Sequence, residues 1–189
     1  MLSIRIKGRR KSYCIDLNHR VTLLSDVSAS GKTQFVKALF DKAGLFKISV
    51  EEVINGQREL LSINQVLKLD SRNWDILLSD RSRGKTLYVV DDEDFISTVE
   101  FARALSKRLD AYFLFIVRNY SSTDFVNSFP VSTDAILGLV NEGNCITTKQ
   151  IFVDYDGPEE PYDSAFRKRY GLHSLQYSLK HIHVPKGYD

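Results

Sequence analysis

Three continuous apolar runs place the strongest limit on how this chain can fold. They span residues 21–24, 87–90 and 112–117, and their side chains do not alternate between apolar and polar. Strands that are buried on both faces have this pattern, and they belong mainly to parallel sheets covered by helices. Helical spacing of apolar residues follows the first two runs, over 31–43 and 94–109. This order predicts an α/β fold, with a mostly parallel sheet flanked by helices.

The apolar spacing also indicates which residues of each predicted helix are buried. In the first helix they are Phe35, Val36, Leu39 and Phe40, and Gly44 is the expected stop. In the second helix one stripe carries Phe95, Val99, Ala102, Leu105 and Leu109. The stretch 50–85 is less regular, and we interpret it as polar loops with short helical stretches that contain Val53, Ile54, Leu60, Leu61, Val66, Leu67 and Leu69.

Hairpins are predicted on both sides of this central pattern. Residues 2–6 and 13–17 alternate apolar and polar side chains around a polar break that contains Gly8. Apolar residues between 136 and 153 surround Asn141–Asn144, which is typical of a C-terminal hairpin. We therefore expect one domain over 1–189, with a core of 1–120 and a C-terminal extension of 121–189.

Composition and charge exclude several classes of protein. The hydrophobic fraction of 43% and the charged fraction of 26% are those of an ordinary soluble chain. The formal net charge of +2 is too small to indicate a nucleic-acid partner by itself. No apolar run is long enough for a signal peptide or a membrane span. Cys14 and Cys145 match no metal or redox spacing, so we interpret them as free thiols of a cytoplasmic protein.

The C-terminal tail is basic and aromatic, and two interpretations of it remain open. It could contact nucleic acid or an acidic partner, or it could form a surface helix and strand that pack on the domain. A metal site would need more ligands than its two histidines. The residues concerned are Arg167, Lys168, Arg169, Tyr170, Lys180, His181, His183 and Lys186.

The segment after the first apolar run has the residues of a phosphate-binding loop. Residues 26–30 form the loop, and Gly31, Lys32 and Thr33 open the predicted helix. Gly31 lets the backbone approach a phosphate, Lys32 supplies a charge for the terminal phosphates, and Thr33 offers a hydroxyl to Mg2+. Backbone N–H groups at a helix start complete such a site. The predicted nucleotide-binding residues are Ser28, Ala29, Ser30, Gly31, Lys32, Thr33 and Gln34.

An acidic run after the second apolar run supplies the other half of the site. Asp91 is expected to hold Mg2+ together with Thr33, and Asp92 to polarise the attacking water, with Glu93 as the alternative to Asp92. Alone, such a run would be explained as an N-cap for the next helix. The two motifs together favour a nucleotide site. A second Gly-Lys-Thr, residues 84–86, precedes a strand instead of opening a helix, so we assign it no phosphate.

On these two motifs the chain resembles the P-loop NTPases. Asp26 to Thr33 resembles a Walker A segment, and Leu87 to Asp92 resembles a Walker B segment. The N-terminal hairpin is similar to the start of ABC-type and related ATPase heads, so the resemblance covers residues 1 to about 120. It implies an α/β sandwich that binds Mg-ATP or Mg-GTP and often hydrolyses it.

The end of the third apolar run resembles a different branch of the family. Arg118 and Asn119 stand where AAA-type proteins place a sensing polar residue. The resemblance implies that Arg118 contacts the terminal phosphate, and the alternative is a salt bridge at the end of the strand.

Several positions depart from the family pattern. Asp26 stands at the first Walker A glycine, and Ala29 stands at a further glycine that is common in ABC proteins. The ABC signature Leu-Ser-Gly-Gly does not occur, and residues 78–81 are a poor substitute. The Asn-Lys-x-Asp run that specifies guanine does not occur either, so adenine is favoured.

The predicted function is binding of Mg-ATP, with GTP as the alternative nucleotide, and slow or partner-dependent hydrolysis. Lys32, Asp92 and Arg118 are the predicted catalytic residues. A protein partner or a second copy would supply a further charge in trans. One alternative is a non-catalytic regulator or inhibitor that keeps the fold to bind another macromolecule. Another is a small-molecule kinase in which Arg81 and Arg83 clamp the phosphates.

Overall fold

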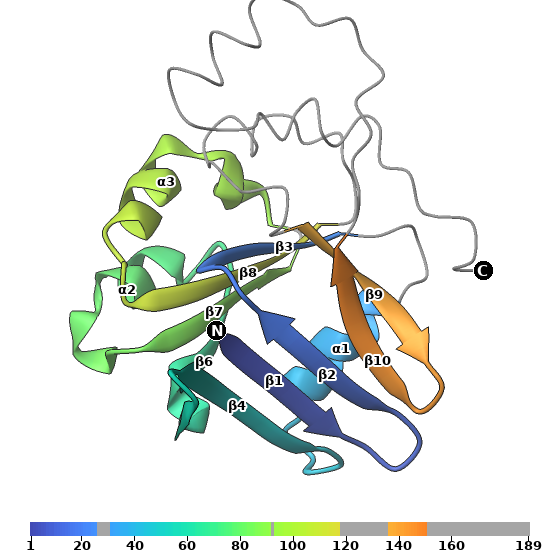
Figure 1. The fold of residues 1–189 in the computed structure, drawn as a ribbon. Helices are drawn as coiled ribbons and strands as arrows, with labels where there is room; N and C mark the ends of the chain where they lie inside the picture. Colours follow the sequence, from blue (N-terminus) through green and yellow to red (C-terminus); the bar gives the residue numbers. More distant parts are fainter. Residues whose placement is uncertain (26–30, 92, 118–135, 151–189) are drawn as a thin grey trace, which may run out of the picture.

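The computed structural model of the chain describes residues 1–25, 31–91, 93–117 and 136–150. Predictions for the C-terminal tail therefore lie outside the described residues. The strands are β1 (Leu2–Lys7), β2 (Ser12–Leu17), β3 (Val21–Ser25), β4 (Lys47–Ile54), β5 (Gln57–Leu60), β6 (Val66–Leu69), β7 (Thr86–Asp91), β8 (Ala111–Val117), β9 (Ile136–Glu142) and β10 (Cys145–Gln150). They form one sheet in the order β5-β4-β1-β2-β10-β9-β3-β8-β7-β6 (Figure 1).

Short helices connect these strands. The α-helices are α1 (Lys32–Leu39), α2 (Trp74–Ser79) and α3 (Val99–Ser106), and the 3-10 helices are η1 (Ile63–Gln65), η2 (Arg81–Arg83) and η3 (Asp94–Ser97). None of the helices in the described ranges has the length and apolar character that crossing a bilayer requires.

The sheet is mixed and curled, so the predicted fold class is wrong. Strands β9, β3, β8, β7 and β6 run parallel to one another. Strands β5, β4, β1 and β2 pair antiparallel, as does β10 with β9. The ten strands curl into a half-barrel instead of a parallel sheet with helices along both faces. The physical reason is that β1 and β2 alternate apolar and polar residues, which buries only one of their faces.

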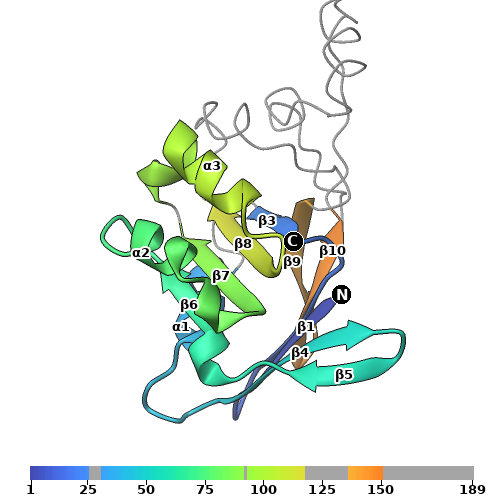
Figure 2. The ribbon, with the colours of Figure 1, turned by 90° about the vertical axis from the view of Figure 1, so that its left-hand side faces the viewer.

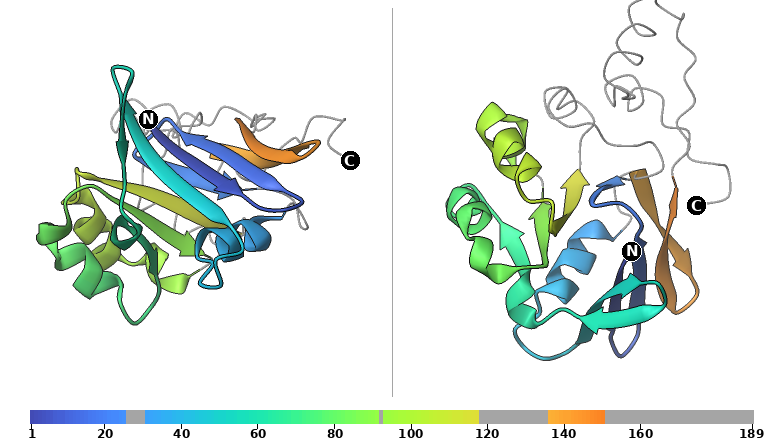
Figure 3. Two further views of the ribbon diagram at one scale, coloured as in Figure 1. Left: turned by 90° about the horizontal axis from the view of Figure 1, so that it is seen from below. Right: turned by 60° about the vertical axis from the view of Figure 1, so that its left-hand side comes forward.

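Helix α1 lies inside the curl, between the two parts of the sheet (Figure 3). Phe35 and Leu39 are fully buried there, in one core with residues from both parts. The ring of Phe35 lies 5.5 Å from that of Tyr13 on β2. The helix therefore packs against antiparallel and parallel strands at once, and its first turn is anchored by both.

Helices α2 and α3 cover the opposite face of the parallel strands. An aromatic cluster forms this second core, in which Phe101 contacts Trp74 and Phe95 at ring distances of 5.5 and 4.9 Å. Phe95 and Leu105 are buried as the predicted stripe requires. Val99 and Leu109 are not, with 55% and 77% of their surfaces exposed, because Val99 is the first residue of α3 and Leu109 lies beyond its end at Ser106.

The predicted short helices between residues 50 and 69 are also wrong. This stretch forms β4, β5 and β6, and β4 pairs with β5 as a hairpin that projects at one end of the sheet (Figure 2). The turn is Asn55-Gly56, in which both residues have positive φ, 50° and 81°. Such two-residue turns match the twist of a β-hairpin, and Asn-Gly is their usual sequence.

The two predicted terminal hairpins are present. β1 pairs with β2, and β9 pairs with β10. The second hairpin lies in the middle of the sheet, where β10 pairs with β2 and β9 pairs with β3. Residues 136–150 therefore belong to the same sheet as the N-terminal core.

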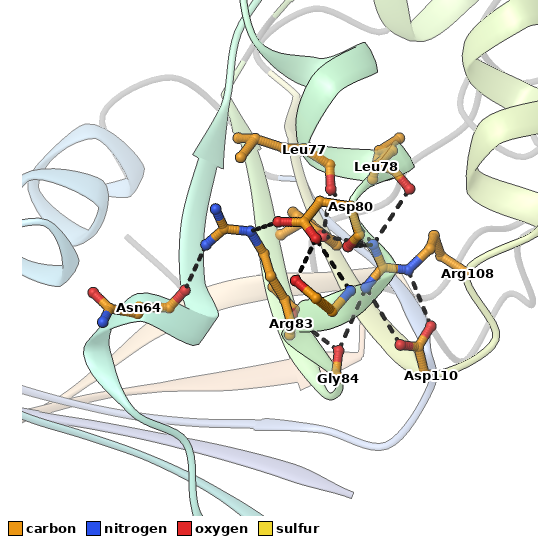
Figure 4. Close-up of polar contacts among 11 residues, drawn as sticks. Asn64, Leu77, Leu78, Asp80, Arg83, Gly84, Arg108 and Asp110 are labelled. Atoms are coloured by element: carbon orange, nitrogen blue, oxygen red, sulfur yellow. Dashed lines mark hydrogen bonds and ion pairs between the residues drawn. The ribbon is translucent and has the colours of Figure 1, made fainter.

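Arg108 is the largest fully buried side chain, with 1% of its surface exposed. Its guanidinium donates to both carboxylate oxygens of Asp110, at 3.1 and 3.3 Å, and to the hydroxyl of Tyr88 at 2.9 Å (Figure 4). It also donates to the backbone carbonyls of Leu77, Leu78, Asp80 and Gly84. The carbonyl ends of helices need such donors, so Arg108 fastens the end of α2 to β7 and to the start of β8.

Candidate functional site

The carboxyl ends of β3, β8 and β7 meet at one edge of the sheet. Leu24 of β3 and Asp91 of β7 both pair with Ile116 of β8, one from each side. At ordinary strand spacing the two residues lie about 10 Å apart, with β8 between them. The chain leaves β3 at Ser25 at this edge, where Asp91 ends β7.

Asp91 stands on the face of the sheet that α1 covers. Leu87 and Val89 belong to the core around α1, whereas Tyr88 and Val90 belong to the core under α2 and α3. Because side chains alternate along a strand, Asp91 continues the series of Leu87 and Val89. The predicted metal carboxylate therefore lies at the edge where β3 ends and on the face that α1 covers.

Gly31 caps the start of α1 in a left-handed conformation, with φ 91° and ψ 9°. A Cβ there would meet nothing within 4 Å, so the backbone conformation is what favours glycine. The first intrahelical bond runs from Phe35 N–H to Gly31 C=O at 2.9 Å. Lys32 is buried, with 8% exposed, while Thr33 and Gln34 are exposed. The first turn thus has N–H groups without an intrahelical partner, beside the exposed side chain of Thr33.

Several predicted site residues lie outside the described residues, and their roles stay predictions. They are Asp26, Ser28, Ala29, Ser30, Asp92 and Arg118. Glu93, the alternative to Asp92, is described: it is half-buried and forms the extended N-cap of η3.

Lys68 is a further residue at this edge. Its Nζ lies 3.4 Å from Oδ2 of Asp91, and it comes from β6, the neighbour of β7. Lys68 pairs with Val89 in register, two residues before Asp91, so both side chains stand on the α1 face. The sequence offers one signal for it, a lone lysine inside the apolar run of β6.

Few described side chains at this edge can bind a metal ion, and those that can would bind it through oxygen atoms. The ranges that the structure describes contain no group of three or more His, Cys, Asp or Glu side chains able to hold a metal ion. The edge supplies the Asp91 carboxylate, and the start of α1 supplies the Thr33 hydroxyl. Mg2+ in nucleotide sites is held by one or two such groups, and phosphates and water complete its shell. One carboxylate and one hydroxyl would suffice for Mg2+ carried by a nucleotide, and they are too few for an all-protein metal site.

The second Gly-Lys-Thr has a structural role. Lys85 contacts the Glu52 carboxylate on β4 and lies 3.0 Å from Oε2 of Glu59 on β5. The hydroxyl of Tyr112 on β8 donates to Oε1 of Glu52 at 3.0 Å. Burial acts to raise the pKa of Glu52, but the bonds from Lys85 and Tyr112 outweigh it and hold that pKa below its usual value. These contacts join the β4–β5 hairpin to the parallel strands.

Tyr112 makes the stability of the protein sensitive to alkaline pH. Burial, followed by its bond to Glu52, raises the pKa of Tyr112 from 10.0 to about 12. The unfolded chain then ionises at lower pH than the folded chain, so this contribution to stability is complete below pH 10 and disappears as the pH rises through about 12. We expect the stability difference between wild type and Tyr112→Phe to shrink across this range. Urea unfolding at a series of pH values measures it, and a constant difference would contradict the pKa shift.

Arg83 lies at the opposite edge of the sheet. Its Nε pairs with Asp80 Oδ2 at 2.8 Å, and η2 precedes the start of β7. Asp91 is at the far end of that six-residue strand, about 20 Å away by strand geometry. The structure therefore does not bring Arg83 and η2 to the start of α1, as the predicted clamp requires.

Comparisons with known proteins give no match. No protein-family model, no curated protein and no solved structure matches the chain.

Proposed function

We propose that this protein binds a Mg-nucleotide, with ATP favoured over GTP, and hydrolyses it slowly or only with a partner. One observation carries the proposal: β3 and β7 end at the same edge of the sheet, and Asp91 lies on the face that α1 covers. The predicted loop follows β3 and the acidic run ends β7, so the parallel pairing of both strands with β8 supports a single site built from both motifs.

The proposed roles follow from this placement. Lys32 and the N–H groups from Ser28 to Gln34 hold the phosphates, and Thr33 and Asp91 hold Mg2+. The metal ion neutralises charge on the phosphates when it is bound. Asp92 positions water, and Arg118 contacts the terminal phosphate. Since the chain lacks the ABC signature, a protein partner or a second copy supplies a further positive charge.

Calorimetric titration with Mg-ATP and Mg-GTP tests the proposal. We expect a Kd on the order of micromolar for the wild-type protein, and weakening of at least about tenfold in Lys32→Met. Lys37→Met is the matched control, because Lys37 is an exposed lysine in the last turn of the same helix. Equal binding by wild type and Lys32→Met, or no binding at millimolar nucleotide, would overturn the proposal.

A non-catalytic regulator is the second candidate, and the β4–β5 hairpin favours it. Every residue of β5 is exposed, and β5 ends the sheet with Leu60 largely uncovered. Exposed strand edges can bind an extended segment of another protein. If the protein is such a regulator, calorimetric titration with Mg-ATP or Mg-GTP should show no binding. The kinase alternative is not supported, because Arg83 lies at the start of β7, at the edge of the sheet opposite to Asp91.

A cytoplasmic location is part of the proposal. Cys14 and Cys145 are both free thiols, as is usual in a reducing compartment. The proposed site also requires a compartment that contains nucleoside triphosphates.

A further inference from the structure

We infer that Lys68 is a built-in counter-cation of Asp91, which Mg2+ must displace when the nucleotide binds. The inference rests on the proposed function and adds a device that sets the metal affinity of the same site.

The Asp91 carboxylate needs a cation nearby. The side chain of Asp91 is only 10% exposed, and a carboxylate withdrawn from water to this extent is unfavourable without a compensating charge. Lys68 approaches it from β6, with Nζ 3.4 Å from Oδ2. Both residues project from the face that α1 covers, so the ammonium occupies one side of the carboxylate that would bind the metal ion.

The contact is of a kind that can be exchanged. The side chain of Lys68 is 41% exposed, so its ammonium can turn into water. Ion pairs with one exposed partner contribute little to stability. An ammonium is also a compact charge on a flexible stem, without the two-point grip of a guanidinium. Lys68 can therefore leave Asp91 without unfolding its surroundings.

The ammonium and Mg2+ compete for the same carboxylate. Two cations at one carboxylate repel each other, so the metal binds only as Lys68 moves away. Removing the charge of Lys68 should tighten the binding of Mg-ATP, and strengthening its hold on Asp91 should weaken it. The two changes should therefore shift the affinity for Mg-ATP in opposite directions, which a general effect on folding would not produce.

The test compares four proteins: wild type, Lys68→Met, Lys68→Arg and Lys47→Met. Lys68→Met keeps an apolar stem of similar length and removes the charge, whereas Lys68→Arg can bind Asp91 through two hydrogen bonds. Lys47→Met makes the same chemical change at an exposed lysine of β4 in the antiparallel part. Calorimetry gives the Kd of each protein for Mg-ATP and, with EDTA present, for metal-free ATP. Melting temperatures show whether each protein is folded.

We expect Lys68→Met to bind Mg-ATP about three- to fivefold more tightly than wild type, the range set by a weak ion pair. Lys68→Arg should bind it more weakly, Lys47→Met should match wild type, and no tightening should occur with EDTA. Weaker Mg-ATP binding by Lys68→Met would overturn the inference, because Lys68 would then hold phosphate. Equal affinities in all four proteins would overturn the inference about Lys68 but not the proposed function. Absence of binding by wild type would overturn the proposed function as well.

Discussion

Replacing Arg108 by leucine is expected to destabilise the protein more than any other single change considered above. The substitution removes the donor that serves Asp110, the Tyr88 hydroxyl and the carbonyls at the end of α2. Breaking a buried network of this kind by removing one partner costs about 3–5 kcal/mol. That is a large share of the stability of a single domain, and the melting temperature should fall by roughly 10 °C.

Urea and thermal unfolding of Arg108→Leu measure this loss. The matched control is Arg103→Leu, since Arg103 is an exposed arginine of α3, and it should change stability by no more than about 0.5 kcal/mol. Arg108→Lys should lie between the two, because an ammonium cannot reach the carboxylate and the carbonyls together. A loss below about 1 kcal/mol in Arg108→Leu would show that the network does not hold α2 in place.

Replacing Phe35 by alanine is the second change with a large expected effect. Phe35 is fully buried on α1, between the antiparallel and the parallel strands. Removing a buried aromatic ring costs about 3–5 kcal/mol, because the surroundings collapse only partly into the space it leaves. Phe35→Leu retains much of the volume and should cost less, by the same reasoning.

Urea unfolding again provides the measurement, and Gln34→Ala is the control. Gln34 is the exposed neighbour of Phe35 in the same turn of α1, so its truncation should be almost neutral. If Phe35→Ala and Gln34→Ala unfold at the same urea concentration, α1 does not lie between the two parts of the sheet.

The sequence predicts the parallel strands β3, β7 and β8 well, because each is buried on both faces, whereas it does not predict β6. The apolar runs at 21–24, 87–90 and 112–117 correspond to β3, β7 and β8, and the second Gly-Lys-Thr precedes a strand as expected. Which apolar runs lie side by side is a different question. Nothing in their periodicity shows that β8 pairs with both β3 and β7, which is what brings Asp91 to the edge where α1 begins.

The antiparallel part shows where such reasoning fails. The apolar pairs Val53-Ile54 and Leu60-Leu61 predict short helical stretches, yet Asn55-Gly56 is the turn signal that indicates a hairpin. The alternation in β1 and β2 indicates that one of their faces is buried, but no local pattern shows that this face packs on α1. Arg108 is a case of the same kind, since only the fold shows that seven acceptor atoms surround it.

The place of the β9–β10 hairpin has a consequence for how the protein folds during its synthesis. β2 and β3 are separated in the chain by only three residues, yet the hairpin that lies between them is made more than 110 residues later. Until residue 150 has left the ribosome, β2 and β3 each expose an unpaired edge. Sheets that depend on such distant pairing form slowly and are prone to aggregation while incomplete. A nascent chain of this protein should therefore depend more on chaperones before the hairpin emerges than after it.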